Sequence, residues 1–332
     1  PSLQADMVVL AIGVTPDTVL AKEAGLELGI KESIVVNDRM ETSVPDIYAA
    51  GDAVQVKHYV TGNDALISLA GPANKQGRII ADNICGGDSR YLGSQGSSVI
   101  KVFDMTAATT GINETNAQKS GLEVDTVILS PMSHAGYYPG GKVMTMKVVF
   151  EKETYRLLGA QIIGYEGVDK RIDVLATAIH AGLNATQLKD LDLAYAPPYS
   201  SAKDPVNMAG FMIDNIAKGT LKQWHLEDMD KISKDKDVVL LDVRTVGEFS
   251  RGHIDGFKNI PVDELRERIS EIEKGKPVYL ICQSGLRSYI ASRILEGNGY
   301  ETYNFSGGFR FYDAVVNDRA LIERAYACGM DY

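Results

Sequence analysis

Short apolar runs and one helical pattern make up the first part of the chain. The run Met-Val-Val-Leu-Ala-Ile-Gly at residues 7–13 predicts a buried strand, and segments 33–37 and 46–50 predict two more. A helical pattern begins near Gly71-Pro72 and should end at Gly86-Gly87, because proline suits a first helical turn and glycine a helix end. Strands and helix together indicate an α/β unit, which a Gly/Ser-rich stretch closes.

Beyond that stretch the pattern changes to alternating strands and then to helices. Residues 142–151 alternate and are rich in β-branched side chains, and residues 155–163 predict the second strand of a hairpin. Helices are expected at 169–181 and at 205–217, the latter with Asp204 as its N-cap. Strands followed by helices indicate an α+β unit.

The last part of the chain alternates continuous apolar runs with helical patterns. Residues 238–241 and 278–281 have the length of buried parallel strands, and helices are predicted at 263–273 and 288–296. This pattern indicates a third unit, of the α/β class with a parallel sheet. The predicted fold is therefore multidomain, α/β and α+β, with units at residues 1–96, 97–222 and 223–332.

Composition narrows the class of protein. Of the 332 residues 45% are hydrophobic and 23% charged, which excludes global disorder. A net charge of −10 argues against general binding to nucleic acid or an anionic membrane, and no apolar run is long enough to predict a membrane span. The sequence predicts no metal site. Three cysteines fit a reducing, cytoplasmic compartment, and the start at Pro1 inside a strand-like pattern indicates a piece of a longer protein.

Cys282 lies in the loop between the predicted strand 278–281 and the helix 288–296. Backbone N–H groups of such a loop can surround an atom carried by the sulfur, while the helix N-terminus and Arg287 add positive potential. The pattern favours a reactive thiolate that holds an anionic adduct. The alternative is a small buried cysteine that ends a strand. The residues expected to form the persulfide-binding loop are Gln283, Ser284, Gly285 and Leu286.

The length of this loop separates two chemistries. Four residues lie between Cys282 and Arg287, one fewer than in cysteine phosphatases, and the tighter cup suits a single extra sulfur. With Leu-Asp-Val-Arg at 241–244 and Phe-Ser-Gly-Gly-Phe at 305–309, the loop makes residues 236–316 resemble a rhodanese domain. The resemblance implies that Cys282 takes up sulfane sulfur as a persulfide and passes it to an acceptor thiol. Four charged or polar residues of these motifs are interpreted as structural: Asp242, Arg244, Glu248 and His253. Cys328 is considered as a resolving thiol.

A stretch of small residues in the first unit ends in Gly51-Asp52. Small side chains let a ligand approach the backbone, and a carboxylate can accept hydrogen bonds from hydroxyl groups; alone, however, Gly-Asp after a strand is an ordinary turn. In its context the stretch resembles the second FAD-binding motif of flavoprotein disulfide reductases. The resemblance implies that Asp52 holds the ribityl chain of FAD and that the following helix, with Ala70 and Ala73, directs its N-terminus at the isoalloxazine.

Three further motifs make the resemblance narrower. The segments 70–78, 134–140 and 195–205 resemble those of coenzyme A disulfide reductases and of NADH-dependent persulfide or polysulfide reductases fused to a rhodanese domain. The resemblance implies a dimerisation domain at 97–222, from which Tyr137 and Tyr195 reach the partner subunit's flavin site. The alternative is that both tyrosines only cap the sheet and that Lys203 is a solvated charge. The residues implied to contact coenzyme A are Asn74 and Lys203.

The chain departs from that family by lacking the Gly-x-Gly-x-x-Gly fingerprint, the redox cysteine beside the flavin and a second nucleotide-binding fold. It therefore resembles the C-terminal portion of such an enzyme. The prediction is part of a homodimeric reductase that uses FAD and NADH or NADPH and acts on coenzyme A disulfide, coenzyme A persulfide or polysulfide, joined to a sulfurtransferase. Its expected partners are low-molecular-weight thiols and persulfides. The alternatives are a sulfurtransferase alone and a non-catalytic dimerisation or binding module.

Overall fold

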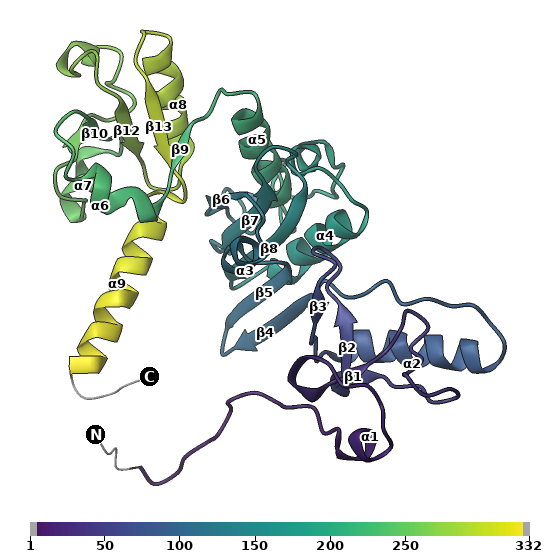
Figure 1. Ribbon diagram of the computed structural model, residues 1–332. Helices are drawn as coiled ribbons and strands as arrows, with labels where there is room; N and C mark the ends of the chain where they lie inside the picture. Colours follow the sequence, from purple (N-terminus) through teal and green to yellow (C-terminus); the bar gives the residue numbers. More distant parts are fainter. Residues whose placement is uncertain (1–4, 328–332) are drawn as a thin grey trace.

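The protein is described by a computed structural model that covers residues 5–327, with side chains through residue 318 (Figure 1). Three separate sheets follow one another along the chain, and each carries helices of its own. Within the described part of the chain, no helix combines the length and the apolar character needed to cross a membrane.

The first sheet is small and has the strand order β1-β2-β3. β1 is parallel to β2, and β3 is antiparallel to it. Met40, Val54 and Val56 are buried against Ile79 and Ile80 of the long helix, which forms where it was predicted. The elements of this unit are α1 (Val19–Glu23), η1 (Ile30–Glu32), β1 (Ile34–Val35), η2 (Gly51–Ala53), β2 (Val54–Lys57), β3 (Asp64–Ala65) and α2 (Ala70–Ile84).

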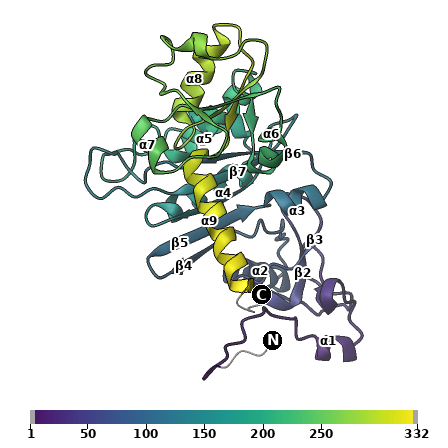
Figure 2. The ribbon, with the colours of Figure 1, turned by 90° about the vertical axis from the view of Figure 1, so that its left-hand side faces the viewer.

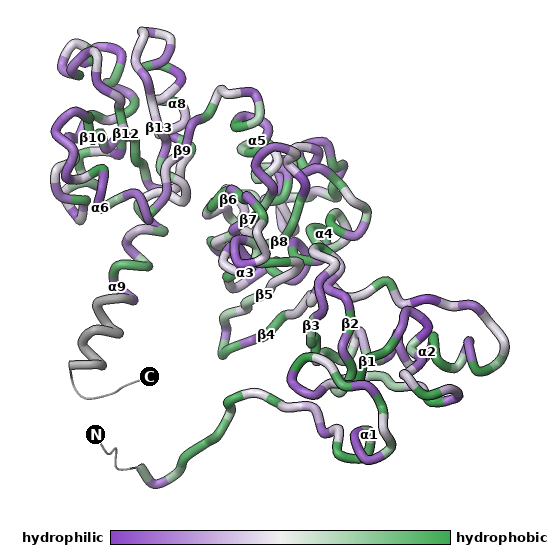
Figure 3. The backbone as a smooth tube through the Cα atoms, viewed as in Figure 1, coloured by the Kyte–Doolittle hydropathy of each residue, from purple (hydrophilic) through white to green (hydrophobic). Residues whose placement is uncertain are grey.

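Two strands predicted in this unit are wrong. Residues 7–13 pair with no strand of the described chain, and Ile12 is 92% exposed, so the run lies apart from the sheet as a green segment (Figure 3). An apolar pattern makes a strand only where a neighbour satisfies its backbone. Residues 46–50 contribute a single bridge, from Tyr48 to Glu41, because the chain turns at Asp46, whose φ is +64°.

The middle sheet is antiparallel throughout, with the order β4-β5-β8-β7-β6. The predicted hairpin is confirmed as β7 and β8, and both predicted helices are present as α4 and α5. Asp204 caps α5, since its side chain accepts a hydrogen bond from Val206 N at 3.0 Å. The elements are β4 (Ser98–Val102), β5 (Met105–Gly111), α3 (Glu114–Lys119), β6 (Val124–Leu129), β7 (Thr145–Glu151), β8 (Leu157–Gly164), α4 (Val168–His180), η3 (Ala185–Asp190) and α5 (Pro205–Ala217).

The last sheet is parallel throughout, as predicted, with the order β11-β10-β12-β13-β9. In two views α9 projects away from this sheet (Figures 1 and 2). The elements are β9 (Gln223–Trp224), η4 (Leu226–Asp228), α6 (Met229–Ile232), β10 (Val239–Asp242), α7 (Val246–Arg251), β11 (Lys258–Asn259), η5 (Ile269–Glu271), β12 (Val278–Ile281), α8 (Leu286–Glu296), β13 (Thr302–Phe305) and α9 (Gly308–Ala327).

The α-helix predicted at residues 263–273 is wrong. The segment is a series of turns that ends in the short 3-10 helix η5. Tyr300 explains part of this, because its hydroxyl donates to the carbonyls of Ile269 and Ile272 at 3.2 and 3.0 Å and so competes with helical hydrogen bonds. The apolar side chains still pack inward, which is why the pattern resembled a helix.

The middle and last units meet along β6 and β9. Asp125 of β6 accepts hydrogen bonds from Gln223 Nε2 and His225 Nε2, both at 3.1 Å, and Ile128 N donates to Ser306 Oγ at 3.1 Å. Burial lowers the pKa of His225, but the hydrogen bond and charge of Asp125 outweigh it and leave that pKa raised. A His–Asp pair therefore joins the two units.

Candidate functional site

Cys282 follows β12 directly, and its sulfur faces polar groups of the loop. The residue is 1% exposed, and Sγ accepts hydrogen bonds from Gly285 N at 3.1 Å and from Ser288 Oγ at 3.2 Å. Gly285 adopts a φ of +100°, which favours glycine, and it begins α8. A backbone N–H, a hydroxyl and a helix N-terminus thus converge on the sulfur, an arrangement that stabilises negative charge there.

Two residues of this site were missed by the sequence analysis. Ser288 supplies the hydroxyl, and Asn304 of β13, which is 3% exposed, donates to Gly285 O at 3.2 Å and so holds the residue whose N–H meets the sulfur. Ser288 could have been found from its place in the first turn of the predicted helix. Asn304 is distant in sequence and looks like any strand residue, so it left no local signal.

Arg287 is held by a carboxylate. Its two terminal nitrogens each donate to Glu248 at 2.7 Å, a bidentate ion pair between α8 and α7. This bond, more than any other contact, lowers the pKa of Glu248 to about 2. The sequence analysis expected the guanidinium to add positive potential around the sulfur, and in the structure its hydrogen bonds go to Glu248. Arg287 therefore contributes charge near the loop from a fixed position.

The other residues of the rhodanese-like motifs make packing contacts, ion pairs or close backbone contacts around the loop. Asp242 and Arg244 form a buried ion pair at 2.7 Å, which agrees with the structural interpretation of both. His253 stacks on Phe249 with ring centroids 4.0 Å apart. Gly308 lies so close to the loop that a Cβ there would be 2.7 Å from Ser284 N, which explains the glycine of this motif.

Tyr137 and Tyr195, which are 58 residues apart, meet through their hydroxyls at 2.8 Å. Both are exposed, by 76% and 45% respectively. Their hydrogen bond raises the pKa of Tyr195, and partial desolvation and charge repulsion from Tyr137 act in the same direction. The structure therefore brings together the two tyrosines that the sequence analysis singled out, and presents them at the surface as a linked pair of donors.

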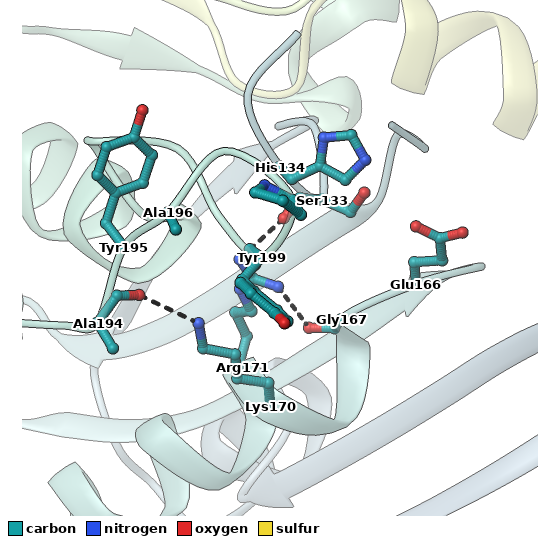
Figure 4. Close-up of a pocket in the computed structure, with 11 residues that line it drawn as sticks. Ser133, His134, Glu166, Gly167, Lys170, Arg171, Ala194, Tyr195, Ala196 and Tyr199 are labelled. Carbon is teal, nitrogen blue, oxygen red and sulfur yellow. Dashed lines mark hydrogen bonds between the residues drawn. The ribbon is translucent and has the colours of Figure 1, made fainter. Parts of the chain in front are cut away.

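A pocket of about 640 Å³ adjoins this pair (Figure 4). It lies between the loop that carries Tyr195 and the first turn of α4, and Lys170 Nζ reaches Ala194 O at 3.5 Å across it. Its lining residues include Ser133, His134, Glu166, Arg171, Tyr195 and Tyr199.

Gly51, Ala70 and Ala73 lie close together in the first unit. Gly51 has a φ of +83°, and a Cβ on it would contact the Cβ of Ala73 at 4.0 Å. Gly51 N donates to Gln76 Oε1 at 2.7 Å, a partly buried contact that sequence reasoning missed. Ala70 opens α2, whose first turn has neither a side-chain cap nor an acidic residue, and Asp52 is exposed beside it. The amides of this helix end are available to a ligand.

The other predicted residues lie on different units. Asn74 is on the exposed side of α2, where Nδ2 donates to Ala70 O at 2.9 Å, and Lys203 is exposed in the turn before α5. Cys328 lies outside the described residues. Among the side chains of residues 5–318, no cluster of three or more His, Cys, Asp or Glu is arranged to hold a metal ion.

Comparisons with known families agree with the division into three sheets. Residues 1–77 match the pyridine nucleotide-disulphide oxidoreductase family, and residues 97–205 match its dimerisation domain. Residues 225–314 match the rhodanese-like domain.

Individual relatives give the same picture. The NAD(P)H sulfur oxidoreductase (CoA-dependent) of Pyrococcus abyssi is 39% identical over 61% of this chain and 45% of its own length. The crystal structure of reduced Bacillus anthracis CoADR-RHD matches with a TM-score of 0.93 and 48% identity, over 96% of this chain and 57% of that one. The NAD-dependent persulfide reductase of A. fulgidus matches with a TM-score of 0.85 and 42% identity, over 93% and 56%.

This chain spans about half the length of these relatives. The two oxidoreductase matches and the rhodanese-like match fall on separate sheets of the structure. The chain therefore contains part of a pyridine nucleotide-disulphide oxidoreductase, with its dimerisation domain, followed by a rhodanese-like domain.

Proposed function

We propose that the last unit transfers sulfane sulfur through Cys282. The observation that carries this proposal is the convergence of Gly285 N and Ser288 Oγ on Sγ at the start of α8. The Cys282 thiolate would attack the terminal sulfur of a persulfide or polysulfide. The remainder leaves with the bond electrons, as a thiolate from a persulfide or as a polysulfide one sulfur shorter. Cys282 then carries the extra sulfur as Cys–S–S⁻, and the loop N–H groups stabilise its charge.

Release of the sulfur is the same kind of substitution as its uptake, with Cys282 now as the leaving group. An acceptor thiolate, such as that of coenzyme A, attacks the outer sulfur, and Cys282 leaves as a thiolate while the acceptor becomes a persulfide. Because Cys282 is only 1% exposed, the acceptor thiol must reach a buried sulfur.

We propose that the first two units belong to a reductase of coenzyme A persulfide, coenzyme A disulfide or polysulfide, which uses FAD and NADH or NADPH. The residues fit FAD: the uncapped start of α2 and the exposed Asp52 offer donors and an acceptor, and Gly51 leaves room beside Ala73. When bound, FAD supplies the two-electron transfer. Asp52 would bind its ribityl hydroxyls, with Ala70 and Ala73 alongside.

In this proposal the tyrosine pair donates a hydrogen bond to the reacting sulfur. The hydroxyl of either Tyr137 or Tyr195 is left with a proton to donate, because the pair shares one hydrogen bond between two donors. That proton would stabilise a departing thiolate. Asn74 and Lys203 would contact coenzyme A. The dimerisation domain supports a homodimer, in which the exposed pair faces the partner subunit.

The unit boundaries at 96/97 and 222/223 and a cytoplasmic location are part of the same proposal. The three sheets and their core clusters support the boundaries, and the described cysteines, Cys85 and Cys282, are both free thiols, as expected in a reducing compartment.

A sulfur-transfer assay tests the proposal. The purified chain is given thiosulfate or polysulfide with cyanide or dithiothreitol as acceptor, and Cys282→Ala is compared with Cys85→Ala, a matched control for an exposed thiol. We expect activity in the parent chain and in Cys85→Ala, and none in Cys282→Ala. Equal activity in all three variants would contradict the role of Cys282.

A sulfurtransferase without reductase function is the second candidate. It is favoured by one observation: the hydrogen bonds of the Cys282 loop all come from residues of the last unit, such as Glu248, Asn304 and Phe309. Flavin binding separates the two candidates. Titration of the chain with FAD, followed by fluorescence quenching, should show saturation that Asp52→Ala weakens if the reductase proposal holds.

A further inference from the structure

We propose that Arg171 is the positioning residue that sets the distance between the hydroxyls of Tyr137 and Tyr195. The inference rests on the role proposed above for the tyrosine pair. Both tyrosines lie on loops and are exposed, so their own packing does not fix them. Arg171, in contrast, is 1% exposed and lies on the rigid helix α4 behind both loops (Figure 4).

The guanidinium of Arg171 reaches both loops at once. Nη2 donates to Ser133 O at 2.9 Å, four positions before Tyr137 in the chain. The same nitrogen lies 3.4 Å from Tyr199 O and 3.1 Å from Ser200 Oγ, in the turn that follows Tyr195. One planar group therefore ties together two loops that are distant in the sequence.

Asp204 completes the arrangement. Its Oδ2 accepts from Arg171 Nε at 3.2 Å, from Arg171 Nη2 at 3.0 Å and from Ser200 Oγ at 2.7 Å. Its Oδ1 caps α5. Since Asp204 is only 3% exposed, this is a buried ion pair with most of its hydrogen-bonding capacity satisfied, the condition under which such a pair fixes geometry.

The two loops are also joined to each other. Ala135 N donates to Ser200 O at 2.9 Å, between the segments that Arg171 holds. A shift of either loop would therefore break both this bond and the contacts to the guanidinium. Such a closed set of bonds leaves the backbones that carry the tyrosines little freedom to move apart.

The backbone near Arg171 is shaped to admit its side chain. Arg171 Nη1 donates to Gly167 O at 3.2 Å, and a Cβ on Gly167 would lie 2.1 Å from that nitrogen. Only glycine avoids that clash, and its φ of +68° suits glycine as well. Lysine in place of Arg171 would keep the charge but offer a single nitrogen, which cannot serve Gly167, Ser133 and Asp204 together.

The experiment measures the titration of Tyr195 in the full 332-residue chain. 3-Fluorotyrosine is incorporated at position 195, and its ¹⁹F resonance is followed against pH in the parent, Arg171→Lys and Tyr137→Phe. Tyr137→Phe breaks the hydrogen bond that raises the pKa of Tyr195. The fall in the pKa of Tyr195 in this variant is therefore the largest fall expected from losing the bond. We expect Arg171→Lys to give at least half of that shift.

Arg244→Lys is the matched control, because Arg244 is an equally buried arginine paired with an aspartate, Asp242, in the last unit. We expect it to leave the titration of Tyr195 unchanged. Ser200→Ala, which removes one link and keeps the ion pair, should give a smaller shift in the same direction and decides the matter if Arg171→Lys does not fold.

The outcomes distinguish failure of the positioning role of Arg171 from failure of the proposed role of the tyrosine pair. If Tyr137→Phe shifts the titration but Arg171→Lys and Ser200→Ala do not, the positioning role is overturned while the tyrosine pair stands. If Tyr137→Phe itself has no effect, the pair is absent in solution, and both the inference and the proposed use of the tyrosines fail. A shift in Arg244→Lys as large as in Arg171→Lys would reduce the role of Arg171 to general stability.

Discussion

The cysteine loop and the tyrosine pair are built in opposite ways. Around Cys282 the contacts to the sulfur come from Gly285 and Ser288, within six positions in the sequence, and the sulfur is buried. Tyr137 and Tyr195 come from loops 58 residues apart and are exposed. The groups that contact the sulfur come from one short turn, which Asn304 supports from β13. The tyrosine pair has no such local turn, and a third group, Arg171, holds its two loops.

The first test removes the guanidinium of Arg171, which joins the two tyrosine loops. Arg171→Met leaves Asp204 buried without its partner, and breaking such a pair costs about 3–5 kcal/mol of unfolding free energy. Trp224 is the single tryptophan and is buried in the core of the last unit, so its fluorescence reports chiefly on that unit. We expect the urea concentration at the midpoint of unfolding, measured by circular dichroism, to fall. The midpoint measured by Trp224 fluorescence should stay unchanged.

A shift of equal size in the Trp224 signal would show that the two units unfold together. In that case the stability of the tyrosine region would not be separate from that of the cysteine loop, and the contrast between them would lose its energetic basis.

The second test crowds the cysteine loop. Gly308→Ala places a Cβ 2.7 Å from Ser284 N at a φ of +68°, and we expect a loss of about 2–3 kcal/mol in the Trp224 transition together with reduced sulfur transfer. Gly275→Ala is the matched control, because Gly275 has a φ of +84° with nothing within 4 Å of its would-be Cβ. It should cost only about 1 kcal/mol and leave sulfur transfer intact; equal losses would refute the steric account.

The third test concerns the ion pair beside the loop. The pKa of Glu248 lies at about 2 in the folded protein, below its usual value of 4.5, so its stabilising effect is complete above pH 4.5 and is lost as the pH falls towards 2. At neutral pH Glu248→Gln should lower the unfolding free energy by about 1–2 kcal/mol, allowing for partial exposure. Chemical denaturation of both proteins between pH 7 and pH 2 should show the difference vanish; a constant difference would contradict the ion-pair explanation.

The smallest expected effect is at the contact between the middle and last units. Since the pKa of His225 is raised in the folded protein, its pairing with Asp125 stabilises fully below the unfolded value near 6.5 and is lost as the pH rises through the folded value. Asp228 and Glu227 add to the same shift. Asp125→Asn should cost about 0.5–1 kcal/mol at pH 6 and less at pH 9, measured by the Trp224 transition; a larger cost at pH 9 would reverse the sign of the linkage.

The sequence predicted well wherever the signal was local. The hairpin β7–β8 follows from alternation and a turn, and α5 from Asp204 and Pro205 at its start. The cysteine loop was likewise predictable from the order strand, cysteine, glycine and helix. The tyrosine pair was found through motif resemblance, because nothing local links two positions on separate loops.

The failures share a physical cause, which is dependence on distant partners. The apolar run at 7–13 lacks a strand beside it, and the helical pattern at 263–273 yields to the hydroxyl of Tyr300. Arg171 went unnoticed because a charged residue in a helix is most often solvated, and only the fold shows the carbonyls that it reaches. The ion pair of Arg287 with Glu248 left no local signal, because the two residues are 39 positions apart.

The most direct test of the central claim is the mass of the Cys282 peptide after the chain has been exposed to polysulfide, alkylated and digested. The account predicts that this peptide gains the mass of one sulfur atom beneath the alkyl group, and that the Cys85 peptide does not, although Cys85 is the more exposed thiol. An unmodified Cys282 beside a persulfidated Cys85 would mean that exposure, and not the loop around the sulfur, decides where sulfur is carried.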